Sequence, residues 1–109
     1  METIEIRYGT SIDFSIAVDS TDAQQATLYV GKMGDTPVIS KSANFVDGVA
    51  FLNLDSNDTK VAPDTYSYQV SVIYAGVNQK KKFPEASDCV NNELPKFIIN
   101  PSLDEEYVA

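Results

Sequence analysis

Histidine and tryptophan are absent from this chain of 109 residues, and cysteine occurs once, as Cys89. Histidine is the side chain that most often serves as a base near neutral pH, so its absence argues against most hydrolase and zinc schemes. A single cysteine cannot form a disulfide within the chain, and no histidine is present to activate its thiol for catalysis. We therefore expect a protein that is not an enzyme and that uses neither a cofactor nor a metal.

Basic residues and long apolar runs are also scarce. Eight lysines and arginines stand against sixteen acidic residues, and the resulting net charge of −8 opposes binding to the phosphate backbone of nucleic acids. The longest apolar run, residues 49–52, is far shorter than the roughly 20 residues of a membrane-spanning helix. The acidic N-terminal segment also lacks the features of a secretory signal. Neither nucleic acid nor membrane is therefore an expected partner.

The composition that remains is that of an ordinary globular protein, with 43% hydrophobic and 22% charged residues. The length corresponds to about one domain. We expect residues 1–100 to form that domain and residues 101–109, which include three successive acids, to form an acidic C-terminal tail.

Apolar and polar residues alternate with a period of two through most of the chain, and this pattern predicts β-strands. The strongest signal is residues 66–74, where five large residues share one face, so we expect a central strand there. Pro37 precedes a short strand that we place at a sheet edge. The expected strands cover residues 4–8, 12–18, 26–30, 38–41, 49–54, 66–74, 78–83 and 96–99.

Short strands at intervals of about 8–12 residues, separated by glycine, proline and short polar residues, are typical of two packed antiparallel sheets. We therefore predict an all-β fold, an immunoglobulin-like antiparallel β-sandwich of about seven or eight strands. Tyr66 stands where such a sandwich crosses between its sheets. It is either a tyrosine corner, whose hydroxyl bonds backbone a few residues upstream, or simply the start of a strand. Asp58 or Thr59 is placed to cap the turn before it.

Oxygen-bearing side chains cluster at residues 55–58, with Asp47 and Asp64 on either side, so calcium has to be considered. An EF-hand loop starting at the first of these residues would place Lys60 and Tyr66 where the loop needs glycine and glutamate. The cluster also resembles the calcium-binding linker of cadherins, but that motif ends a domain and this one lies mid-chain. We favour a turn in which the short side chains bond the local backbone.

The only basic run is Lys80, Lys81 and Lys82. On a strand the three lysines alternate between faces, and their ordinary role is to keep an edge strand from pairing with another chain. The alternative is an electrostatic contact with an acidic partner, for which the C-terminal acids around Glu105 of a neighbouring copy are a candidate.

The tail after the last strand has two interpretations. It is either solvated, or it is an arm that orders against a neighbour with Tyr107 and Val108 as apolar anchors. Together with the lysine run and Glu105, these residues are the candidate partner contacts.

Four segments stand out when read together: residues 7–10 (RYGT), 12–16 (IDFSI), 26–30 (ATLYV) and 63–70 (PDTYSYQV). Their arrangement resembles a known family, the small immunoglobulin-like modules of tailed-phage virions, including the first domain of upper baseplate proteins. The resemblance covers roughly residues 4–76.

This resemblance implies a virion structural component, either a decoration or auxiliary protein of the capsid or an adaptor of the tail or baseplate. Its partners would be other virion proteins and further copies of itself, bound by surface contact. Two alternatives stay open. A glycan-binding module requires an exposed aromatic platform, for which Tyr29 and Tyr107 are available. A calcium-dependent adhesion module would use the acidic cluster described above.

Overall fold

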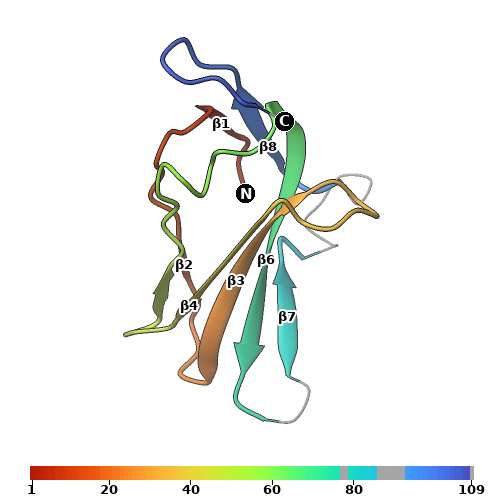
Figure 1. The fold of residues 1–109 in the computed structure, drawn as a ribbon. Coiled ribbons are helices and arrows are strands. Elements are labelled where there is room, and N and C mark those ends of the chain that lie inside the picture. Colours follow the sequence, from red (N-terminus) through yellow and green to blue (C-terminus); the bar gives the residue numbers. More distant parts are fainter. Residues whose placement is uncertain (77–78, 86–92, 109) are drawn as a thin grey trace.

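The computed structural model describes residues 1–76, 79–85 and 93–108, and every regular element within them is a β-strand (Figure 1). None of these residues forms a helix with the length and hydrophobicity needed to cross a membrane. In chain order the strands are β1 (Ile4–Arg7), β2 (Ser15–Ala17), β3 (Ala23–Gly31), β4 (Ile39–Asn44), β5 (Val49–Phe51), β6 (Asp64–Tyr74), β7 (Lys80–Phe83) and β8 (Lys96–Asn100).

Strand β6 organises the larger, six-stranded sheet, in which five strands follow the order β1-β8-β6-β3-β4 and the sixth, β7, also pairs with β6. One edge of β6 pairs with β3, and the other pairs first with β8, over residues 64–67, and then with β7, over residues 70–73. The expected central strand is therefore confirmed. The strand after Pro37 is also confirmed as an edge strand, because β4 ends the sheet.

The second sheet contains only β2 and β5, which pair antiparallel over three residues each. The two sheets pack face to face, so the prediction of an all-β sandwich is confirmed. One ladder differs from the antiparallel expectation: β1 and β8, the first and last strands of the described chain, run parallel. Parallel neighbours need a long connection, and here the whole intervening domain supplies it.

The strand expected at residues 12–18 is shorter than predicted, because the side chain of Asn53 interrupts its ladder with the 49–54 segment. The backbone N–H of Phe14 donates to Asn53 Oδ1 at 3.0 Å instead of to a strand carbonyl. Pairing survives on both sides of this point, as β2 with β5 and as an isolated bridge between Ile12 and Leu54.

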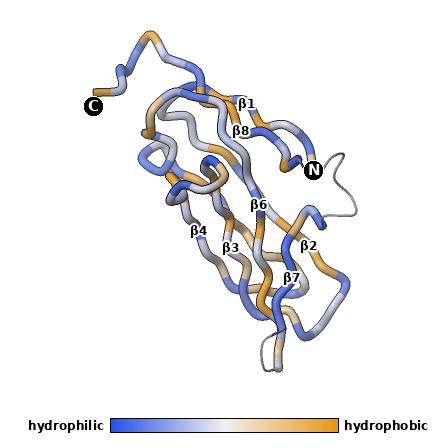
Figure 2. The backbone as a smooth tube through the Cα atoms, turned by 90° about the vertical axis from the view of Figure 1, so that its right-hand side faces the viewer, coloured by the Kyte–Doolittle hydropathy of each residue, from blue (hydrophilic) through white to orange (hydrophobic). Residues whose placement is uncertain are grey.

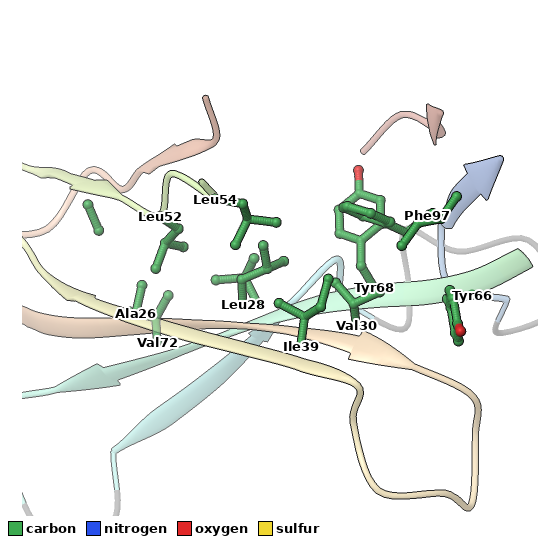
Figure 3. Close-up of a cluster of buried hydrophobic side chains, with 13 residues drawn as sticks. Ala26, Leu28, Val30, Ile39, Leu52, Leu54, Tyr66, Tyr68, Val72 and Phe97 are labelled. Carbon is green, nitrogen blue, oxygen red and sulfur yellow. The ribbon is translucent and has the colours of Figure 1, made fainter. Parts of the chain in front are cut away.

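The core lies between the sheets and follows from the period-two alternation (Figure 3). Leu28 of β3 faces Val70 of β6 in the ladder, and both are fully buried. From the other layer, Leu52 and Leu54 lie over Leu28 in the same core cluster. Each such side chain contributes about 1.5–3 kcal/mol when removed from water, so this layer accounts for much of the stability.

Tyr66 is a tyrosine corner: its hydroxyl donates to the carbonyl of Ala62, four residues upstream, at 2.5 Å. Its ring is buried at the end of the core, and burial raises the pKa of its hydroxyl. The buried hydroxyl of Thr59, one of the two capping candidates, lies 3.4 Å from the carbonyl of Ser56 within the preceding turn. It makes a shorter hydrogen bond, of 2.8 Å, to the carbonyl of Thr10, and this bond joins the crossing segment to the β1–β2 connection.

Candidate functional site

The three lysines of β7 alternate between faces, as the sequence predicts. Lys80 and Lys82 pair with Ile73 and Ser71 of β6, and their side chains project outward from the large sheet. Lys81 projects to the other side, where its ammonium lies 5.8 Å from the centre of the Tyr74 ring. All three side chains are exposed. Among the strands that the structure describes, β7 pairs with β6 alone, so the lysines occupy a sheet edge (Figure 1).

The C-terminal arm folds back on the end of its own domain. Glu105 forms an ion pair with Lys60, with 2.9 Å between Oε2 and Nζ, and this contact raises the pKa of Lys60. The ring of Tyr107 packs edge-on against that of Tyr8, with centroids 6.0 Å apart. Val108 remains exposed.

The arm and β7 lie at opposite ends of the molecule in both views (Figures 1 and 2). Within one chain the structure therefore does not bring Glu105, Tyr107 and Val108 together with the three lysines. A contact between the acidic arm and the lysine strand would have to join two copies, and it stays a prediction.

The acidic cluster at residues 55–58 forms a local turn. Asp55 Oδ1 accepts the backbone N–H groups of Asn57 and Asp58, each at 2.9 Å, and Asp58 Oδ2 accepts the N–H of Asp55 at the same distance. These bonds hold the pKa of Asp55 below its ordinary value of 3.8. Asp55 and Asp58 thus cap each other's backbone, as favoured from the sequence, with Asp55 the main acceptor.

One of the two flanking acids, Asp64, forms an ion pair away from the cluster. Asp64 bonds the ammonium of Lys32, and this hydrogen bond lowers the pKa of Asp64 and raises that of Lys32. Across residues 1–76, 79–85 and 93–108, no three carboxylate, thiol or imidazole side chains are grouped closely enough to hold a metal ion. Cys89 and its loop, residues 86–92, lie outside the described residues.

An exposed apolar surface, which sequence reasoning missed, lies on the outward side of the small sheet, where Ser15 of β2 pairs with Phe51 as the polar member. Phe51 of β5 is 62% exposed and Val46, which bridges to Val49, is 65% exposed. Ala17 of β2 pairs with Val49 on the same side. We call these residues, Ala17, Val46, Val49 and Phe51, the apolar face.

A sequence signal for the apolar face did exist. Residues 49–52 are continuously apolar, a pattern typical of strands that are covered on both faces, whereas a strand with one solvated face alternates. Within the described part of the chain, only the inward side of this segment is covered, by the core around Ala50 and Leu52.

The outward side of the large sheet is polar by contrast. Thr27 and Ser42 share a hydrogen bond of 2.8 Å across β3 and β4, and Tyr29 pairs with Gln69 between β3 and β6. Tyr29, one of the two tyrosines expected to be available at the surface, is half-buried there. A scan against protein-family models found no match, and a search of curated protein sequences found none either.

Proposed function

We propose that this protein is a non-enzymatic structural or accessory component of a phage virion, a capsid decoration or auxiliary protein or a tail or baseplate adaptor, that acts by binding other virion proteins. The assignment to a phage virion rests on the sequence resemblance. The observation that supports binding by surface contact is the apolar face, which exposes Phe51 and Val46 on paired strands of a rigid domain.

Burial of the apolar face against another protein would release water from surface that the domain itself leaves wet. Covering one side chain of the size of phenylalanine contributes about 1.5–3 kcal/mol, and a few aromatic anchors commonly dominate a protein interface. Because β2 and β5 already hold these residues in place, little conformational entropy is lost on docking. The arm's exposed Leu103 and Val108 offer a second, separate apolar contact.

The test is co-sedimentation of the purified protein with capsids and with tails from its source. We expect stoichiometric binding to one of the two particles and no turnover of any substrate. Phe51→Ser is expected to weaken this binding by about tenfold or more.

Ile73→Ser is the matched control, because Ile73 is also partly exposed, at 39%, but lies on the outward side of the large sheet. It is expected to bind like the unaltered protein. Failure to bind either particle would contradict the virion role, whereas equal binding by the Phe51 variant would contradict only the apolar face as the docking surface.

A further inference from the structure

A hollow of 320 Å³ lies on the outward side of the large sheet, away from the apolar face. Its floor is the outward side of β3 and β6, with Tyr29 beside Gln69 and with Ser71 further along β6. One wall is the loop between β3 and β4, residues 32–37, and the opposite wall carries Lys80 and Lys82 of β7. Both walls and the floor are built from residues far apart in the sequence.

The loop wall stands close to the sheet because Gly31 has no side chain. A Cβ atom on Gly31 would lie only 3.0 Å from the Cα of Pro37, so any larger residue would push the loop away. Gly34, at φ +88°, adopts the left-handed conformation that turns the loop back. The wall is therefore held by the backbone and does not depend on a flexible side chain.

The floor also carries hydroxyl and amide groups. Ser71 and Gln69 both line the hollow from the outward side of β6. Such side chains donate and accept hydrogen bonds, so they are suited to a ligand that carries hydroxyl groups.

Positive charge collects around the hollow although the chain as a whole carries −8. The three ion pairs formed among the described residues use Lys32, Lys41 and Lys60. Lys80 and Lys82 take part in none of them, and both line the hollow. Asp35 lies on the loop wall and is the acid among the lining residues.

The position of the hollow decides how a ligand is recognised. It lies over β3 and β6, each of which is already paired along both edges, so backbone groups are not free to add a peptide strand. Recognition must therefore come from side chains: a half-buried tyrosine ring, hydroxyl and amide groups, and two ammonium groups. This set matches a ring that carries many hydroxyls and a negative charge.

We propose that this hollow is a binding site for an acidic saccharide, with the sugar ring packed on Tyr29, its hydroxyls bonded by Gln69 and Ser71, and its carboxylate held by Lys80 and Lys82. The carboxylate is matched by the two local lysines, which take part in none of the ion pairs formed among the described residues.

The test uses an oligomer of galacturonic acid as the probe and the uncharged galactose oligomer of equal length as its control, with binding measured by calorimetry and by amide chemical shifts. We expect the acidic oligomer to bind more tightly and to shift residues of β3, β6 and β7. Tyr29→Ala and Lys82→Gln should each weaken binding by about tenfold.

The matched control variant is Lys81→Gln, which removes the same charge from the neighbouring position but on the other side of β7. Unchanged affinity for this variant supports the proposal. Equal losses from Lys81→Gln and Lys82→Gln, equal binding of the two oligomers, or no binding of either would overturn it. Equal binding of a polyglutamate peptide that is insensitive to Tyr29→Ala would also overturn it, in favour of surface charge alone. None of these outcomes depends on whether the apolar face docks to a virion.

Discussion

The outward sides of the two sheets differ in chemistry although both belong to the same small domain. The large sheet presents hydroxyl, amide and ammonium groups, among them Thr27, Gln69 and Lys82. The small sheet presents the apolar face, with Phe51 and Val46 more than half exposed. One side is therefore suited to water and to polar ligands, whereas the other leaves apolar surface that a protein partner would cover.

The difference can be traced to the sequence pattern of each strand: alternating polar and apolar residues indicate one solvated side, whereas a continuous apolar run indicates two apolar sides. In β6 the polar residues Ser67, Gln69 and Ser71 separate the core positions, so the outward side of the strand there is polar. In the segment 49–52 no polar residue intervenes. Packing in the core accounts for the apolar side chains of Ala50 and Leu52, but it does not account for that of Phe51, which is 62% exposed.

The largest effect on stability is expected when a charged side chain replaces a buried residue of β6. Val70→Asp, and equally Tyr68→Asp, should abolish the cooperative thermal transition, because a charge buried without a partner costs more than about 4 kcal/mol. Gln69→Asp, one position away on the outward side, should leave the transition in place. Thermal melts followed by circular dichroism check this. If Gln69→Asp melted like Val70→Asp and Tyr68→Asp, the assignment of faces would be incorrect.

A smaller difference in stability is expected between variants of two adjacent residues, Phe51 at the end of β5 and Leu52 directly after it. Leu52→Ala should destabilise the protein by about 2–5 kcal/mol because it leaves a cavity in the core. Phe51→Ala should change stability by less than about 1 kcal/mol, since its ring is already mostly in water. Urea denaturation of both variants gives the comparison, and a large loss from Phe51→Ala would mean that the apolar face is covered within the monomer.

Acid should loosen the turn that connects the two sheets. The pKa of Asp55 is lowered in the folded protein by its bonds to backbone N–H groups, so its contribution to stability is present above its ordinary pKa of 3.8 and is lost as pH falls below that value through the folded-state pKa. Asp64 and Asp104 have lowered pKa values as well and contribute in the same window. Asp55→Asn, which keeps the oxygen acceptor but not the charge, should show a shallower loss of melting temperature below pH 4. An unchanged slope would argue against the turn as a source of acid sensitivity.

The smallest effect is expected at the exposed lysine edge. Lys81→Ala should alter stability by less than about 0.5 kcal/mol, because an exposed charge near a ring contributes little in water. Equal sensitivity of Lys81 and Val70 in denaturation experiments would remove the distinction between the edge and the centre of the large sheet.

Sequence reasoning predicted the inward faces well, whereas it missed the apolar face. The two sheets, the central strand, the edge strand after Pro37 and the backbone-bonded acidic turn follow from short-range patterns, and the Tyr66 corner was one of two interpretations left open. Lys80, Lys81 and Lys82 were recognised as a run. Their alternation between the two sides of β7 was predicted, but the hollow that Lys80 and Lys82 line was not.

Local alternation was sufficient to specify which residues are buried, because a strand places every second side chain on the same side whatever it pairs with. Long-range pairing set the rest: the parallel contact of β1 with β8 and the reduction of the small sheet to two strands. These features join segments distant in the chain, and their geometry depends on how two twisted layers fit together, which no short stretch of residues encodes.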